Sequence, residues 1–169
     1  MELLDADMRR QAGAVIQACR DAGVRLVAVE ASTGGLLTGM LTLIPGASAV
    51  VDRAVVVYSN ESKPEILHVP VEFFIEHGSV SEPAARAMAH SGLALAKLAH
   101  LCVAVTGVEG PGGTSAAKPA GLVHLAAVQR SKPGVLHEAH HFGDIGRELV
   151  RRASVEAAFA LVLRRLHEA

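Results

Sequence analysis

Three short apolar runs place the strongest constraint on the fold of this 169-residue chain. They lie at 24–30, 53–59 and 100–107, and segments with helical periodicity separate them. Two of them are almost continuously apolar, which is typical of strands buried on both faces of a sheet. Two more strands, 121–129 and 135–142, flank a turn and predict an antiparallel hairpin. The pattern indicates an α/β fold, a three-layer α/β/α sandwich with a mixed, mostly parallel sheet, and we expect the run at 100–107 to lie inside it.

The helices are predicted from apolar periodicity, capping residues and chain breakers. Thr33, Asn60 and Ser81 are expected to be N-caps, because their side-chain oxygens can accept hydrogen bonds from the free N–H groups of a first turn. The predicted helices cover 3–21, 33–43, a segment that begins at residue 60, 70–78, 81–99 and about 145–167.

The composition favours one domain that spans residues 1–169. Half of the residues are apolar, so a sizeable core can form, and the net charge of −1 gives no electrostatic case for binding nucleic acid or an anionic membrane. No run reaches the ~18 apolar residues that a membrane-spanning helix needs. The charged start of the chain lacks the apolar centre of a signal peptide, so we expect a cytoplasmic protein.

The cysteines and histidines do not indicate a metal site or a disulfide framework. Cys19 and Cys102 lie in apolar, periodic segments and are expected to be buried core thiols. The densest histidine cluster is HEAHHF, which contains His137, His140 and His141. On an alternating strand His140 would point away from the other two, so we predict no metal ligands there.

Four polar loops follow predicted strands or precede predicted helices, and ligands in open α/β sheets bind beyond the carboxyl ends of the strands. The longest loop, 106–121, carries several glycines whose N–H groups can converge on an anion, and Lys118 adds a charge. The alternative is a flexible connection, but a loop of about 16 residues inside a compact domain argues against that. The other three loops are EASTGG (30–35), YSNESK (58–63) and HGSVSE (77–82).

Two of these loops carry residues suited to acid–base or nucleophilic chemistry. Tyr58 precedes Lys63 by five residues, and a partly buried lysine becomes a usable base at neutral pH, as amide hydrolysis requires. The other interpretation of this loop is an N-capped helix with a solvated lysine. In the first loop Ser32 is a candidate nucleophile, while Glu30 either caps the following helix or orients a neighbouring group.

These motifs, in their order along nearly the whole chain, resemble the CinA C-terminal domain family and its stand-alone nicotinamide-nucleotide amidases. The family reads roughly AESCTGG, PGSS, YSNEAK, GAVSE, VTGIAGPGGG and a last motif F.GDR…R..A, where this chain reads VEASTGG, PGAS, YSNESK, GSVSE, VTGVEGPGGT and FGDIGRELVRRA. The resemblance implies hydrolysis of the carboxamide of nicotinamide mononucleotide to nicotinate mononucleotide and ammonia. It also implies a stand-alone, cofactor-free domain that binds a small nucleotide and forms a homo-oligomer.

The resemblance also assigns site residues. Tyr58 and Lys63 match the pair that supports the family nucleophile, and with Ser32 they are the expected catalytic residues. Arg147 matches the arginine of the last motif, whose forked guanidinium suits a phosphate. The expected substrate-binding residues are Glu30, Thr33, Gly34, Asn60, Thr106, Gly107, Gly110, Gly112, Gly113 and Arg147.

The first motif departs from the family pattern at the nucleophile. The family serine falls on Ala31 and the family cysteine on Ser32, and the last motif has one residue more before Arg147. One hypothesis is an amidase that uses Ser32 or a water activated by Lys63. Another is a protein that kept the nucleotide pocket but lost hydrolysis, because removal of a covalent nucleophile costs orders of magnitude in rate. A third, a partner-binding module, predicts an exposed apolar patch in place of a polar pocket.

Overall fold

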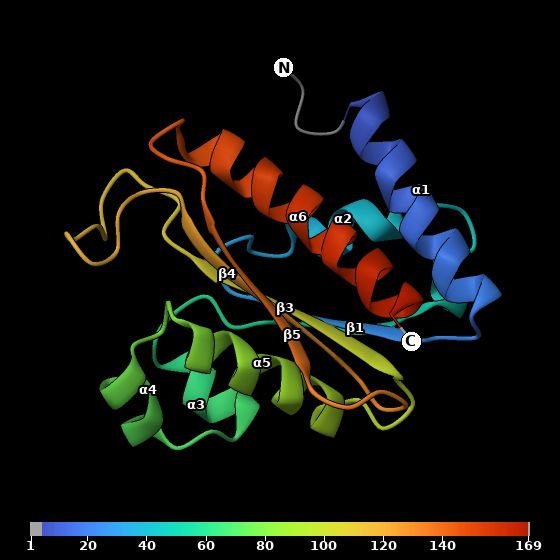
Figure 1. Cartoon of the computed structure of the whole chain (residues 1–169), viewed down its shortest axis with the longest axis horizontal. Helices are drawn as coiled ribbons and strands as arrows, with labels where there is room; N and C mark the ends of the chain where they lie inside the picture. The colour runs from blue at the N-terminus through green and yellow to red at the C-terminus, as the bar shows by residue number, and fades with distance from the viewer. Residues whose placement is uncertain (1–4, 169) are drawn as a thin grey trace.

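A five-stranded mixed sheet lies between two layers of helices in the computed structural model, which describes residues 5–168 (Figure 1). The sheet order is β2-β1-β3-β4-β5; β2 and β3 run parallel to β1, whereas β4 is antiparallel to both β3 and β5. Every strand except β4 therefore runs in the same direction, which confirms the predicted mixed, mostly parallel sheet. The strands are β1 (Leu26–Glu30), β2 (Val51–Val56), β3 (Leu101–Gly107), β4 (Leu122–Gln129) and β5 (Val135–His141).

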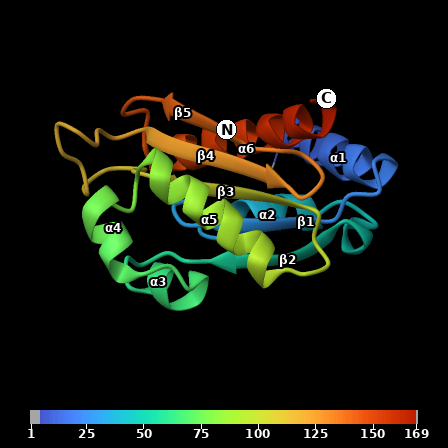
Figure 2. The same cartoon turned by 60° about the horizontal axis from the view of Figure 1, so that its bottom comes forward.

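Each face of the sheet packs against its own helical layer and its own apolar core (Figures 1 and 2). One layer holds α1 (Ala6–Asp21), α2 (Leu36–Thr42) and α6 (Arg147–His167). The other holds α5 (Glu82–Leu95), which packs on the sheet, with the short helices α3 (Ser62–Leu67) and α4 (Val71–His77) beside it. A 3-10 turn (Ala47–Ala49) leads into β2. The first two residues of the predicted 3–21 helix lie outside the described residues.

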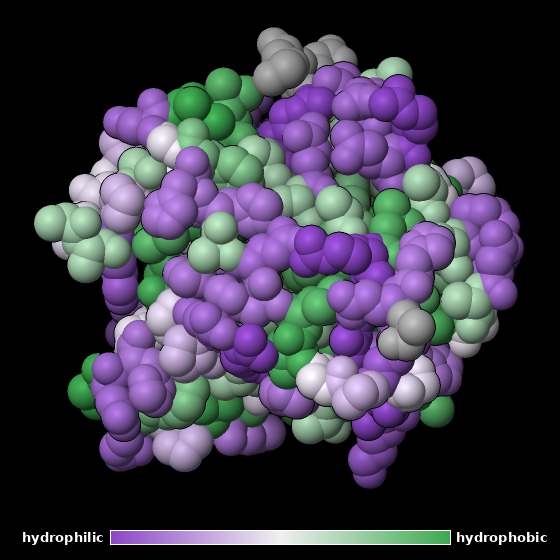
Figure 3. All heavy atoms as spheres, in the orientation of Figure 1, coloured by the Kyte–Doolittle hydropathy of each residue, from purple (hydrophilic) through white to green (hydrophobic). Residues whose placement is uncertain are grey.

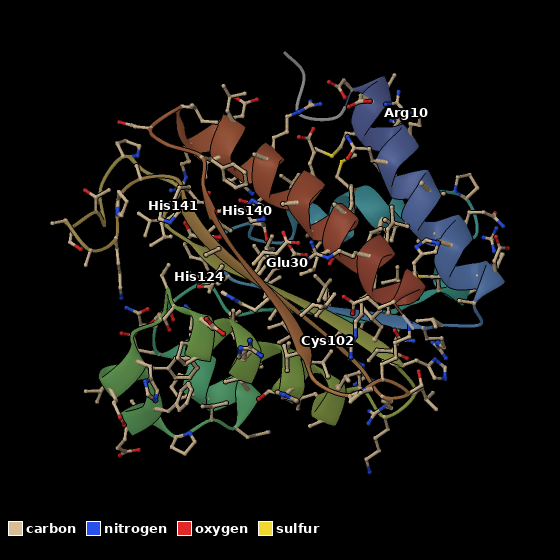
Figure 4. All side chains as sticks on the ribbon, viewed as in Figure 1. Arg10, Glu30, Cys102, His124, His140 and His141 are labelled. Carbon is tan, nitrogen blue, oxygen red and sulfur yellow. The ribbon has the colours of Figure 1, made fainter. Side chains whose placement is uncertain are left out.

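The run at 100–107 forms the central strand β3, as predicted, with β1 on one side and β4 on the other. Its side chains alternate between the two cores, and Cys102 faces α5 (labelled in Figure 4). Helix α5 approaches closely because Gly92 has no side chain: a Cβ there would lie 2.4 Å from the Cys102 sulfur. Cys19 and Cys102 are both fully buried, as expected, and burial raises the pKa of the Cys19 thiol to about 12.

Two predictions about strand position and helix length were wrong. The apolar run at 53–59 is not a buried strand: β2 lies at the sheet edge, where it pairs only with β1 and leaves Val56 43% exposed. Helix α5 ends at Leu95 rather than at residue 99. The guanidinium of Arg130 donates to the carbonyls of Leu93 and Ala96, so the chain turns there toward β3.

The structure confirms the N-cap predicted at Ser81 and contradicts the one predicted at Asn60. Ser81 is the N-cap of α5, and its hydroxyl accepts a hydrogen bond from the Ala84 N–H. Asn60, in contrast, does not cap α3, because its side-chain oxygen accepts a hydrogen bond from the Ser79 hydroxyl at 2.7 Å. This contact joins the second polar loop to the third.

The histidines of β5 separate onto the two faces of the strand. His137 lies 3.0 Å from His124 of β4, whereas His140 lies 2.6 Å from the carboxylate of Glu138 and stacks on Phe142. His140 therefore points away from His137, as the alternation predicts. None of the helices within residues 5–168 is long and apolar enough to span a membrane.

Candidate functional site

A cavity of about 490 Å³ opens where the carboxyl ends of β1, β2 and β3 meet. This volume is typical of a small-molecule site. All four polar loops predicted from the sequence contribute to its wall, since the parallel strands end at the same edge of the sheet. The lining residues are Ala31, Ser32, Tyr58, Asn60, Lys63, Phe74, Gly78, Ser79, Val80, Thr106, Gly107, Val108, Glu109, Gly110, Gly112, Gly113, Lys118 and Arg147.

The three expected catalytic residues share this cavity, and so do most of the expected substrate-binding residues. Those that line it are Ser32, Tyr58, Lys63, Asn60, Thr106, Gly107, Gly110, Gly112, Gly113 and Arg147. Three others, Glu30, Thr33 and Gly34, are not on the wall, and each has a different place in the structure.

Glu30 is fully buried at the N-terminus of α2 (Figure 4), and its carboxylate is occupied by protein donors. One oxygen accepts from the Thr33 hydroxyl and from the N–H groups of Gly35 and Leu37, at 2.7, 3.0 and 3.1 Å. The other accepts from the N–H and hydroxyl of Thr38. Glu30 therefore caps α2 in place of the predicted cap Thr33 and positions the first loop, with no oxygen left for a substrate.

Thr33 and Gly34 support the cavity wall from behind. The Thr33 carbonyl accepts a hydrogen bond of 2.6 Å from Arg151 of α6. Gly34 has a φ of 60°, a left-handed conformation that favours glycine, and it lies beside the Arg151 guanidinium and the Tyr58 ring. Thr33 and Gly34 therefore affect a ligand only indirectly, because they hold the first loop in position.

Lys63 is only 3% exposed, which excludes the solvated lysine of the alternative interpretation. Its ammonium donates to the main-chain carbonyls of Ser59 at 3.1 Å and Tyr58 at 3.5 Å. Burial lowers the Lys63 pKa, and the nearby negative charge of Glu61 only partly opposes this. Lys63 therefore contacts Tyr58 through the main-chain carbonyl, while the Tyr58 hydroxyl is bound by Arg147.

Arg147 lies beside the Tyr58 hydroxyl at the wall of the cavity. One guanidinium nitrogen donates to that hydroxyl and another donates to the Gly110 carbonyl at 3.1 Å. The arginine of α6 therefore joins the loop after β2 to the loop after β3. Nearby, the Thr106 hydroxyl donates to the Ser79 carbonyl at 2.7 Å and attaches the third loop to β3.

Glu109 is the site residue that the sequence analysis missed. It is 4% exposed and lines the cavity beside Ser32, which is 8% exposed. Within residues 5–168, neither carboxyl oxygen of Glu109 nor the hydroxyl of Ser32 has a hydrogen-bond partner. Burial raises the Glu109 pKa, while the Ser32 hydroxyl and the positive charges of Arg147 and Arg151 oppose that shift. The signal was an acidic residue inside a glycine-rich loop, where the family motif has alanine.

Known proteins resemble the chain over most of its length. A model of the CinA C-terminal domain family matches residues 8–166. A CinA-like protein from Gloeobacter violaceus is 41% identical over 144 residues, 85% of this chain, and one from Syntrophobacter fumaroxidans is 42% identical over 145 residues, 86% of it. The chain spans 33% of the length of each of these relatives.

Solved structures agree with this fold. The competence/damage inducible protein CihA from Agrobacterium tumefaciens superposes with a TM-score of 0.92 and 43% identity, over 99% of this chain and 100% of that one. The competence damage-inducible protein A from Klebsiella pneumoniae subsp. pneumoniae has a TM-score of 0.88 and 31% identity, over 96% and 99% of the two chains.

Proposed function

Because the chain belongs to the CinA C-terminal domain family, we propose that its cavity hydrolyses the carboxamide of a small nucleotide. The expected substrate is nicotinamide mononucleotide, and the products are nicotinate mononucleotide and ammonia. The observation that carries the proposal is that one cavity contains both the buried amine of Lys63 and the hydroxyl of Ser32, which has no hydrogen-bond partner in the described residues. An amine with a lowered pKa can exchange protons near neutral pH, and the hydroxyl supplies a nucleophile.

The glycine-rich loop supports an anionic ligand in the same cavity. Gly110, Gly112 and Gly113 have positive φ angles of 66°, 94° and 66°, which only glycine adopts readily and which allow successive N–H groups to converge. Lys118 and Arg147 add positive charge to the wall. These groups suit the phosphate of a mononucleotide or an oxyanion that develops during amide hydrolysis.

In the proposed reaction the Ser32 oxygen attacks the carboxamide carbon and loses its proton to a base on the wall. The C–N bond then breaks, ammonia leaves with that proton, and water hydrolyses the acyl-serine to release the acid. The hypothesis of a nucleotide-binding protein without hydrolysis stays the second candidate. Its specific support is Ala31, which occupies the position of the family serine and has no nucleophilic atom.

Ammonia release from nicotinamide mononucleotide by the purified protein tests the proposal. We expect Ser32→Ala and Lys63→Met to reduce the rate by ~100-fold or more. The matched control Lys97→Met removes an exposed amine outside the cavity and should leave the rate unchanged. Calorimetric binding of the mononucleotide without ammonia release would support the second candidate instead.

The proposal includes finer expectations that rest on the family resemblance. These are a single domain over residues 1–169, a cytoplasmic location, catalysis without a cofactor, and assembly into a homo-oligomer. Light scattering of the purified chain measures the oligomer directly, and a monomer at micromolar concentration would contradict that part alone.

A further inference from the structure

The Glu109 carboxyl is buried without a protein hydrogen-bond donor, which is a costly arrangement. Both of its oxygens are unpaired within the described part of the chain, although the side chain is 96% buried. A buried carboxyl without donors loses its hydration without compensation, and proteins rarely keep such a group unless it serves a function. The loop that carries it closes the cavity wall, so the carboxyl faces the place where a ligand binds.

The positive groups around Glu109 are committed to other partners. Arg147 donates to the Tyr58 hydroxyl and the Gly110 carbonyl, and Arg151 donates to the Thr33 carbonyl. They act on Glu109 through their positive charge. Of the lysines on the same wall, Lys63 donates to main-chain carbonyls of the second loop, and Lys118 extends over Gly78, where a Cβ would lie 2.5 Å from its ammonium.

Ser32 is the other cavity-lining residue whose buried side-chain oxygen has no partner in the described part of the chain. Ser32 follows β1, and Glu109 follows the neighbouring strand β3, so the two side chains line the cavity from adjacent strand ends. A carboxylate beside a hydroxyl can accept the proton of that hydroxyl. The pair has the elements of a nucleophile and a base, which need hydrogen-bond reach in the complex and are often less well aligned without a ligand.

We propose that Glu109 is the acid–base partner of Ser32, an inference that rests on the amidase proposed above and adds the residue that moves the proton. When the Ser32 oxygen bonds to the carboxamide carbon, its proton passes to the Glu109 carboxylate. When the C–N bond breaks, Glu109 returns that proton to the leaving nitrogen, and ammonia departs. In the second half, Glu109 takes a proton from the attacking water and returns it to the Ser32 oxygen as the acid leaves.

A serine-directed fluorophosphonate tests the pair without a known substrate. In the labelling reaction the Ser32 oxygen bonds to phosphorus, fluoride leaves, and the proton passes to the Glu109 carboxylate. Intact-mass spectrometry gives the labelling rate across pH, and peptide mapping identifies the labelled residue. We expect the rate for the native protein to rise with pH as Glu109 loses its proton. Glu109→Gln should be at least ~100-fold slower and lack that rise.

The controls separate catalysis from folding. Gln has the shape of Glu, so Glu109→Gln should keep the native circular dichroism, and Glu109→Asp should recover part of the rate if the variant is folded. Asp144→Asn removes an exposed carboxylate near Gly110 and should label like the native protein. Ser32→Ala should not be labelled.

The outcomes also separate this inference from the proposed function. Labelling of Ser32 that depends on Glu109, together with no ammonia from any amide tested, supports the pair and contradicts the amidase. Native-rate labelling of a folded Glu109→Gln with an unchanged pH profile overturns the pair even if the protein is an amidase. Absence of Ser32 labelling in the native protein overturns it as well.

Discussion

Arg147 of α6 donates a hydrogen bond to the hydroxyl of Tyr58, although 88 residues lie between them in the chain. The same guanidinium holds the Gly110 carbonyl, so one side chain connects two loops of the cavity wall. The ring of Tyr58 is 59% exposed, which leaves this connection at the mouth of the cavity and accessible to a ligand. A phosphate that enters the cavity can accept a hydrogen bond from Arg147 either in place of the Tyr58 hydroxyl or alongside it.

Arg147→Ala should therefore weaken nucleotide binding through the phosphate. We expect the dissociation constant of nicotinamide mononucleotide to rise by ~10-fold or more, as loss of a charge-assisted contact predicts, and that of the phosphate-free nucleoside to change little. Titration calorimetry with both ligands measures the difference. Tyr58→Phe is the control, since it removes the hydroxyl but keeps the cation. Equal losses for nucleotide and nucleoside would contradict a phosphate contact.

Lys63 predicts a specific dependence of stability on pH. Because burial lowers its pKa in the folded protein, the unfolded chain binds more protons between that lowered value and the ordinary value of 10.5. The free energy of unfolding of the native protein should therefore rise with pH across this window, relative to Lys63→Met. Calorimetric melting at several pH values tests this. A difference in the free energy of unfolding that does not change with pH would contradict this. For the control Lys97→Met, the free energy of unfolding should change with pH as it does for the native protein.

Much of the fold and the convergence of the loops could be predicted, because they depend on local patterns. The continuous apolar run of β3 indicates burial on both faces, and parallel strands bring their following loops to one edge of the sheet. The position of β2 could not be predicted in the same way. Its apolar run resembles that of β3, and a strand's own sequence does not state whether it has one neighbour or two.

The roles of individual site residues depended on geometry that the sequence does not contain. Glu30 becomes a helix cap because the glycine turn, with Gly35 at a φ of 97°, directs several N–H groups back onto its carboxylate. Glu109 is noticed only when the folded chain places it beside Ser32 and under the positive charges of α6. Neither spacing nor residue type distinguishes such carboxylates from solvated ones.

Glu30→Ala should destabilise the protein strongly. The change leaves five donors at the start of α2 without their acceptor, in a region with little access to water. We expect a loss of about 3 kcal/mol or more in the free energy of unfolding, measured by urea denaturation. Glu72→Ala, at an exposed glutamate of α4, should change it by less than ~0.5 kcal/mol. Similar losses for the two variants would contradict the capping role.

Ala31→Ser tests whether the cavity still accommodates a nucleophile at the family position. Ala31 lines the same cavity as Lys63 and is 4% exposed, so a serine there adds one hydroxyl to the wall that carries the Lys63 amine. We expect ammonia release from nicotinamide mononucleotide to rise by ~10-fold or more. The double variant Ala31→Ser, Lys63→Met should return to the native rate or below, because the new hydroxyl needs the lysine.

Ser32→Ala in the Ala31→Ser background then separates the two nucleophile positions. If the gain survives the loss of Ser32, the new serine acts by itself. If the gain disappears, Ser32 takes part in the reaction of the Ala31→Ser variant as well. If neither the native protein nor Ala31→Ser releases ammonia while both bind the nucleotide, hydrolysis is excluded and the cavity serves binding alone.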